Sequence, residues 1–167
     1  MPTKKKPKVD RDWILAQFSR GVDAKHAMQV DAEATANSPP DPSLAVLYHQ
    51  IAKDDERHMT TIETIATRYG YQPAPHKSGG IGETLGRLKD AVAEMGSSPQ
   101  QRLEQDLTAK ASAIHWATSW VYTFEQIGDA ASSQELNSLL DEEKSHHAAL
   151  QQGLNNLLLK GAQGVMA

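Results

Sequence analysis

The stretch LAVLYHQIAKDDERHMTTIETIATRY (residues 44–69) has the clearest periodicity in the chain. Its apolar residues recur every three or four positions, which is the spacing of one helix face and not the alternation of a β-strand. The residues on this line are Leu44, Leu47, Ile51, Asp55, His58, Ile62, Ile65 and Tyr69. The pattern predicts a helix from about Pro42 to Tyr69 with one face turned to a core.

Two polar residues, Asp55 and His58, lie in the middle of this apolar line. A carboxylate buried without a partner is costly, because it loses the water that solvates its charge. Two such residues on consecutive turns therefore indicate a shared partner such as a metal ion. A hydrogen-bonded or salt-bridged pair without metal is the alternative interpretation.

A second stretch, LNSLLDEEKSHHAAL (residues 136–150), repeats this arrangement within a line of leucines. Glu143 is followed by His146 at the third position and by His147 at the fourth. Both spacings bring two side chains together on a helix. The sequence therefore predicts that Glu143 faces inward and leaves the choice between the two histidines open. A metal-free pair is again the alternative.

The composition limits the class of protein. The chain has 167 residues, enough for one domain with a substantial core. Its formal net charge of −4 gives no overall attraction to nucleic acid, and the absence of cysteine excludes disulfides and thiolate ligands. No apolar run matches a membrane span and no signal peptide is visible, so we expect a cytoplasmic protein.

Clusters of proline and glycine divide the chain into helical segments. We expect helices at residues 10–35, 42–69, 83–95, 99–127 and 133–159. Short connections within the first and last pairs predict two antiparallel hairpins, and the long link between the pairs can cross the length of a bundle. The prediction is an all-α four-helix bundle over residues 10–159 with a short fifth helix in the crossover. Residues 1–9 are expected to be a disordered basic tail, with weak nucleic-acid contact as the minority interpretation, and residues 160–167 a C-terminal tail.

Counting residues back from the loops adds candidates on the first and fourth helices. Asp23 and His26 come near the level of Asp55, and His115 comes near the level of Glu143. The full set of candidate metal ligands is Asp23, His26, Asp55, His58, His115, Glu143, His146 and His147.

The candidates on the first and fourth helices are the weaker ones. The first helix has two overlapping apolar lines, of which only one can face the centre. His115 lies off the best line of its helix, so a partly buried histidine without a ligand role fits equally well. Lys110 falls on that line, where it either extends to solvent or pairs with a carboxylate and so competes with a cation.

The segments IAKDDERHMTTIETI (51–65) and LNSLLDEEKSHHAAL (136–150) resemble the second and last helices of the ferritin-like superfamily. The first segment is similar to rubrerythrin-like proteins, and LLDEEK (139–144) in the second is also similar to the YciE/YciF-type bacterial stress proteins. The resemblance covers about residues 12–158 and implies iron bound by carboxylate-x-x-His pairs, with Asp55 in place of the usual glutamate. It also implies a bridging glutamate on the first and fourth of the five predicted helices, residues 10–35 and 99–127. Those places hold Asp23 and, around residues 113–115, no carboxylate.

Three functional hypotheses follow. The first is a metal-binding ferritin-like protein that holds iron, with manganese or zinc as alternatives. It would oxidise ferrous iron with oxygen or peroxide. Its site is di-iron, mononuclear or richer in nitrogen ligands. The second is a non-catalytic stress protein that keeps the same bundle around a degenerate site and acts as a homodimer through its aromatic fourth helix. The third is a Dps-like cage that contacts DNA through the lysine tail.

Overall fold

The computed structural model describes residues 8–72 and 97–164, and all regular structure in this part of the chain is helical. The elements are α1 (Arg11–Asn37), the 3₁₀ turn η1 (Pro42–Leu44), α2 (Ala45–Arg68), α4 (Pro99–Ile127) and α5 (Ala130–Ala162). The all-α prediction is confirmed. The short helix expected at residues 83–95 lies outside the described residues, as do residues 1–7 and 165–167 of the two expected tails.

Local capping residues explain where the helices begin. Asp10 accepts a hydrogen bond from the backbone N–H of Trp13 at the start of α1. Ser98 and Gln101 form a reciprocal capping box before α4. Asp129 caps α5 by accepting from the N–H of Ser132, so this helix begins three residues before the predicted Ser133.

The boundaries of the other elements follow the same logic. Asp41 accepts from the backbone N–H of Ser43 and Pro42 opens the turn η1, as their order in the sequence predicts. Helix α4 ends at Gly128, whose φ of 84° is a conformation that favours glycine. Helix α5 continues to Ala162, three residues beyond the predicted end at Leu159.

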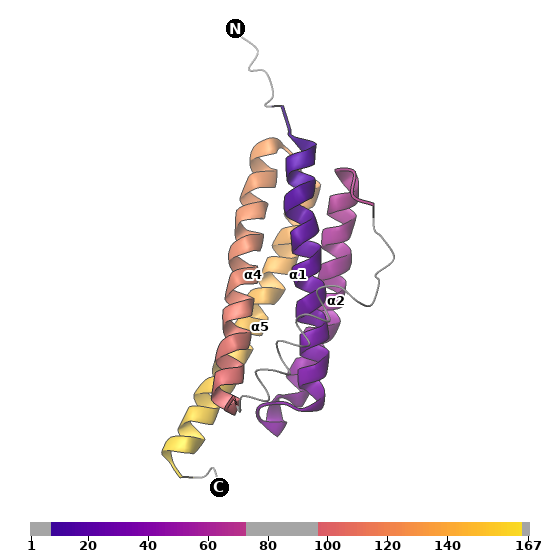
Figure 1. Cartoon of the computed structure of the whole chain (residues 1–167). Coiled ribbons are helices and arrows are strands. Elements are labelled where there is room, and N and C mark those ends of the chain that lie inside the picture. The colour runs from indigo at the N-terminus through magenta and orange to yellow at the C-terminus, as the bar shows by residue number, and fades with distance from the viewer. Residues whose placement is uncertain (1–7, 73–96, 165–167) are drawn as a thin grey trace.

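The four long helices lie side by side along one direction (Figure 1). Helices α1 and α2 run antiparallel and pack against each other, as do α4 and α5, and α2 also contacts α5. Helix α2 ends at the end of the molecule where α1 begins, whereas α4 begins at the opposite end (Figure 1). None of the helices in the described part of the chain combines the length and apolar character that a membrane crossing needs.

Buried apolar side chains form two clusters separated along the helix axes. The first apolar cluster lies at the end where α1 begins and comprises Ile14, Phe18, Val22, Ile62, Ile65, Ala66, Ala117, Trp120, Phe124, Leu136, Leu139 and Leu140. The second comprises Ala32, Ala36, Leu44, Tyr48, Ile51, Ala52, Leu103, Leu107, Leu150, Leu154 and Leu157. On each helix the buried charged residues fall between the two sets, so a polar layer crosses the molecule at mid-height.

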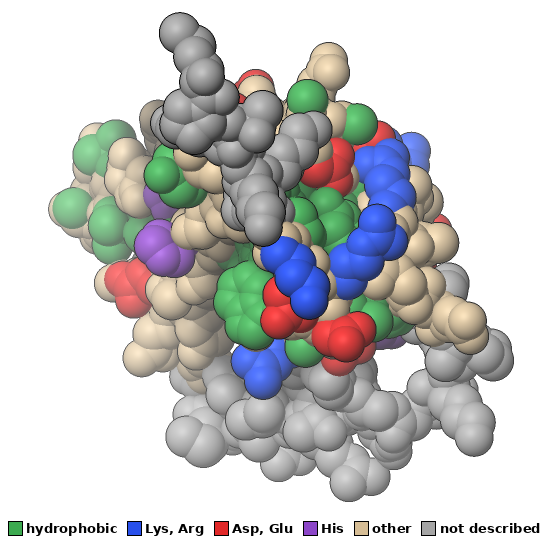
Figure 2. Space-filling model, turned by 90° about the horizontal axis from the view of Figure 1, so that it is seen from above, with side chains coloured by type: hydrophobic (Ala, Val, Ile, Leu, Met, Phe, Trp, Pro, Cys, Tyr) green, Lys and Arg blue, Asp and Glu red, His purple; other side chains and the backbone are tan. Residues whose placement is uncertain are grey.

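The end face of the molecule carries charges of both signs. Figure 2 looks along the helices onto the end where α1 begins and shows acidic and basic side chains next to one another around hydrophobic ones. One such pair joins Arg68 to Glu135 at 2.6 Å. On the part of this face that the structure describes, charges of opposite sign therefore lie close together.

Candidate functional site

The polar layer contains seven buried titratable side chains from all four long helices. They are Lys25 on α1, Asp54, Asp55 and His58 on α2, Lys110 on α4, and Glu143 and His146 on α5. Asp55 and Glu143 have no exposed surface, and both lysines are 3% exposed. Charged groups this deeply buried require partners, and here they find them in one another.

Each lysine touches both central carboxylates. The Nζ of Lys110 donates to the two oxygens of Asp55 at 2.8 and 3.0 Å and lies 3.2 Å from Oε2 of Glu143. The Nζ of Lys25 donates to Oδ1 of Asp55 at 2.8 Å and to Oε1 of Glu143. Two positive and two negative charges therefore alternate around the centre and neutralise one another.

The two ammonium groups keep the central carboxyls ionised. Burial alone would raise the pKa of Asp55, but its interaction with His58 and the charges of the two lysines outweigh burial and hold that pKa far below its usual range. The same three neighbours lower the pKa of Glu143 against the effect of its burial. Both groups are therefore carboxylates at neutral pH.

His58 is held by carboxylates at both ring nitrogens. Nδ1 lies 2.9 Å from Oε1 of Glu143, and Nε2 lies 2.7 Å from Oε2 of Glu142. A carboxylate only accepts hydrogen bonds, so this geometry suits the doubly protonated ring. Burial would lower the pKa of His58, but the contacts with Asp55 and Glu143 outweigh it and raise that pKa above its ordinary value.

His146 differs from His58 in its protonation state. Its Nε2 lies 2.9 Å from Oδ2 of Asp54, whereas its buried Nδ1 has no hydrogen-bond partner among the described residues. Burial and the charge of Lys110 lower the pKa of His146. The ring is therefore neutral, it donates from Nε2 to Asp54, and it keeps a free lone pair on Nδ1.

The two hairpins contribute matching halves of this site. DDERH (54–58) on α2 and EEKSH (142–146) on α5 each place an outer carboxylate, an inner carboxylate and a histidine at the same spacing. The pairing is crosswise, because the histidine of each motif contacts the outer carboxylate of the other. Arg57 adds a link by contacting both outer carboxylates, Asp54 and Glu142.

The structure brings together half of the predicted candidates, namely Asp55, His58, Glu143 and His146. It turns His146 inward rather than His147, which is half-buried. The inward orientation of Glu143 and the pairing of Lys110 with a carboxylate are confirmed.

The other candidates lie outside the polar layer. Asp23 and His115 are exposed and His26 is half-buried. On α1 the buried line runs through Ile14, Phe18, Val22 and Lys25. Because successive residues are rotated by about 100° around a helix, the neighbours of these buried positions point elsewhere.

Lys25 is the functional residue that the sequence interpretation missed. The signal in the sequence was an apolar line that reaches Lys25, because Ile14, Phe18, Val22 and Lys25 follow one another at intervals of four, four and three residues. Lysine is rarely buried unless it is paired, so its position on an apolar line does not by itself mark it as a core residue.

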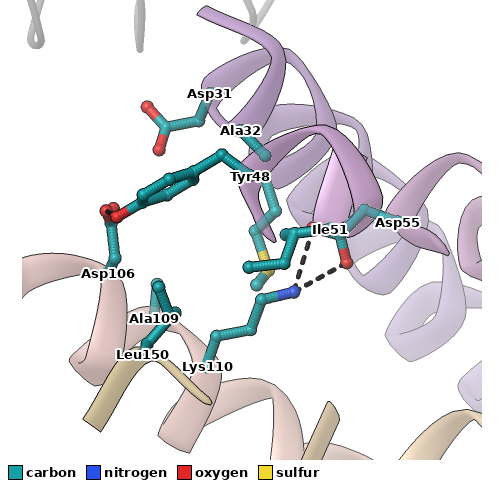
Figure 3. A pocket seen from close by; sticks show the side chains of 10 residues that line it. Asp31, Ala32, Tyr48, Ile51, Asp55, Asp106, Ala109, Lys110 and Leu150 are labelled. Atoms are coloured by element: carbon teal, nitrogen blue, oxygen red, sulfur yellow. Dashed lines mark hydrogen bonds and ion pairs between the residues drawn. The ribbon is translucent and has the colours of Figure 1, made fainter. Parts of the chain in front are cut away.

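A small cavity adjoins the polar layer between α1 and α4. It has a volume of about 30 Å³ and is bordered by Asp31, Tyr48 and Asp106 as well as by Asp55 and Lys110 (Figure 3). The hydroxyl of Tyr48 donates to Asp106, and its burial together with the nearby carboxylate raises the pKa of Tyr48. The cavity therefore connects the central ion pairs to a neutral phenol and is large enough for a water molecule.

Three residues of the layer have the donor set of a metal site. Asp55, Glu143 and His146 each offer one ligand atom, and these atoms lie within 4.8 Å of one another. Two carboxylates and an imidazole suit iron, manganese or zinc. The hydrogen bond from His146 to Asp54 also matches the way that metal-bound histidines are oriented by a second carboxylate. The opposing feature is that the ammonium groups of the two lysines already occupy the oxygens of Asp55 and Glu143.

Comparison of the chain with protein-family models, curated proteins and solved structures finds no match.

Proposed function

We propose that the chain is a ferritin-like four-helix bundle with a long crossover in which two lysine ammonium groups replace the metal ions at the centre. In this proposal the protein is non-catalytic and acts as a metal-independent helical stress protein. The carboxylate-x-x-His motifs on α2 and α5, at the same height in two antiparallel hairpins, support the ferritin-like assignment. The opposite placement of the end of α2 and the start of α4 supports the crossover.

The observation that carries the metal-independent function is the contact of Lys25 and Lys110 with Asp55 and Glu143. The two carboxylates that would neutralise a metal ion are already neutralised. Adding a divalent ion without removing the lysines would leave two excess positive charges among buried side chains. An uncompensated buried charge costs several kcal/mol, so the lysines exclude the ion.

If the centre is inert, the protein acts through its surface. Trp13 on α1 and Tyr122 on α4 are large side chains that are more than half exposed, at 55% and 63%. Exposed aromatic residues are enriched at protein–protein contacts. They support the proposal that the functional unit is a homodimer.

Metal analysis of the full chain, purified without an affinity tag, tests this function. We expect no bound iron, zinc or manganese, and no change in the melting midpoint when ferrous iron or zinc is added anaerobically. A metal that binds only the folded state must raise that midpoint. One equivalent of tightly bound metal, or a midpoint that rises with metal concentration, contradicts the proposal.

The second candidate is the metal-binding function, and a specific observation favours it. The free Nδ1 of His146 points to a missing partner, and its ring is already oriented by Asp54. Asp55, Glu143 and His146 would hold an iron, manganese or zinc ion once the lysines had moved away. Bound iron would supply the oxidation of ferrous ion by oxygen or peroxide. The same titration decides between the two candidates, with a ferroxidase assay as the second measurement.

A further inference from the structure

We propose that the folded chain joins Lys25 to Glu143 by an amide bond between the Nζ of the lysine and the side-chain carboxyl carbon of the glutamate, with loss of one water molecule. The bond would link α1 to α5 and so connect the two hairpins covalently. This inference rests on the proposed function, because a metal ion at the centre would occupy the same carboxylate. The amide would replace the ion pair of Lys25 with Glu143 by a neutral bond and leave the ion pair of Lys110 with Asp55 in place.

The two reacting groups are in contact and shielded from solvent. The Nζ of Lys25 contacts Oε1 of Glu143, and the two side chains come from positions 118 residues apart in the sequence. Holding a nucleophile against its electrophile replaces an encounter in solution by an intramolecular step, and this is one of the largest rate effects that a protein can provide. The fold therefore supplies the orientation that the condensation needs.

Asp55 is placed to move the protons. Its Oδ1 accepts from the Nζ of Lys25 at 2.8 Å. It can take a proton from the ammonium to expose the lone pair of the amine, and it can exchange that proton with Lys110, whose Nζ lies 3.2 Å from the oxygen that leaves. A carboxylate within hydrogen-bond distance of the reacting amine is the geometry of general acid–base catalysis.

The two oxygens of Glu143 have different surroundings. Oε1 lies 2.9 Å from Nδ1 of His58, which stabilises negative charge on that oxygen when the carbon becomes tetrahedral. Oε2 has no hydrogen-bond partner among the described residues, although the Nζ of Lys110 lies 3.2 Å away. Oε1 is thus placed to become the amide oxygen and Oε2 to depart.

The step balances without any further reactant. The ammonium of Lys25 passes one proton to Asp55, while Lys110 gives one proton to Oε2 of Glu143 and recovers one from Asp55, which leaves an amine and a carboxylic acid. The amine nitrogen then bonds to the carboxyl carbon, and the bond from that carbon to Oε2 breaks. The departing hydroxyl leaves as water with a second proton from the nitrogen, carried along the same path through Asp55 and Lys110. No group is oxidised or reduced.

Burial favours the product. In water an ammonium and a carboxylate are well solvated and do not condense, whereas a buried ion pair has lost that solvation. A neutral amide removes two buried charges at once. The adjoining cavity of about 30 Å³ borders Asp55 and Lys110 and can accept the released water.

The geometry favours Lys25 over Lys110 as the nucleophile. Lys110 is hydrogen-bonded to both oxygens of Asp55, at 2.8 and 3.0 Å, so its nitrogen is held between the two oxygens of that carboxylate. Lys25 instead contacts one oxygen of each carboxylate, so its nitrogen is not held between the two oxygens of a single group.

The test is the intact mass of the purified full chain under denaturing conditions, followed by proteolytic mapping. We expect a mass lower than the sequence predicts by one water, and a branched peptide that contains Lys25 and Glu143. Lys25→Arg keeps the charge and cannot form the amide, so it should have the full mass. Lys144→Arg, at an exposed neighbouring position of α5, is the matched control and should retain the bond.

The mass of the unchanged protein decides the matter even if Lys25→Arg fails to fold. A folded chain with the full mass overturns the proposal, as does a lost water that maps to any other pair, including Lys110 with Asp55. Metal analysis separates this result from the proposed function. Metal-free protein of full mass contradicts only the amide proposal, whereas metal-bound protein of full mass contradicts both the amide proposal and the metal-independent function. Metal-bound protein that has lost one water leaves the bond established and removes the metal-independent function.

Discussion

Replacing Lys110 by methionine tests whether the polar layer is a balanced set of charges. Methionine preserves most of the buried volume, so the change removes a charge and leaves the packing largely intact. In the structure this charge contacts both oxygens of Asp55 and lies 3.2 Å from Glu143. Without this charge, a buried carboxylate lacks part of the positive charge that balances it.

The expected loss is about 3–5 kcal/mol of unfolding free energy, the cost of breaking a buried ion pair by removing one partner. For a chain of this size that corresponds to a fall in melting temperature of roughly 6–20 °C. Circular dichroism during heating and urea titration measures both quantities. Lys160→Met is the matched control, because Lys160 also donates to an aspartate at 2.8 Å but its side chain is 46% exposed. That variant should lose less than about 1 kcal/mol.

A second substitution makes the test sharper. Asp55→Asn removes one negative charge, so the double variant Lys110→Met/Asp55→Asn is again balanced and should be more stable than Lys110→Met alone. The coupling in this double-mutant cycle should be about 1–3 kcal/mol in favour of the double variant. Our account of the layer is refuted if Lys110→Met costs no more than Lys160→Met, or if the two central changes are simply additive.

Three further predictions follow from the same geometry. The double variant Lys25→Glu/Lys110→Glu supplies carboxylates where the lysines lie. Without metal it should melt at a lower temperature than the parent, and ferrous iron or zinc should raise its melting midpoint. The absence of any metal response would count against the ferritin-like assignment. The pKa of Asp55 is lowered by folding, so the stability that this carboxylate contributes is present above about pH 4 and is lost as the pH falls further. Urea titrations between neutral and acidic pH should show this loss as a falling midpoint. Gly21→Ala would place a methyl group 2.7 Å from a carbon of the Trp116 indole on α4. Although alanine favours helices, this clash should lower the unfolding free energy by about 1–3 kcal/mol, which a thermal melt measures. An unchanged melt would disprove the close contact.

The helices and the α2 and α5 halves of the site were predictable because their signals are periodic. The otherwise apolar lines of α2 and α5 contain three polar residues, Asp55, His58 and Glu143. A polar residue on such a line faces the core together with its apolar neighbours. The start of α5 was predicted three residues late, at Ser133, whereas Asp129 caps the helix and Ala130 begins it. Capping by an aspartate is a local effect that periodicity does not detect.

The α1 half of the site was placed at the right height and on the wrong face. Counting from the loop gave Asp23, which is two residues, or about 3 Å along the axis, from the buried Lys25. Height depends only on residue number, whereas the face depends on which of two competing lines is buried. On α1 that choice is made by packing against the other helices, which a single sequence does not contain. His115 was misplaced in height, since it lies five residues, or about 7.5 Å along the axis, beyond the buried Lys110 on α4.

The crosswise contacts of His58 and His146 have a consequence for how the two hairpins find their alignment. Layers made of leucine, isoleucine and alanine tolerate sliding, because one aliphatic contact replaces another at little cost. A slip of one helical turn, about 5.4 Å, would carry each histidine past its carboxylate and leave charges from four helices without partners. The charged layer therefore selects one register out of several that the apolar clusters alone would accept, in the way that a single polar residue fixes the alignment of a coiled coil.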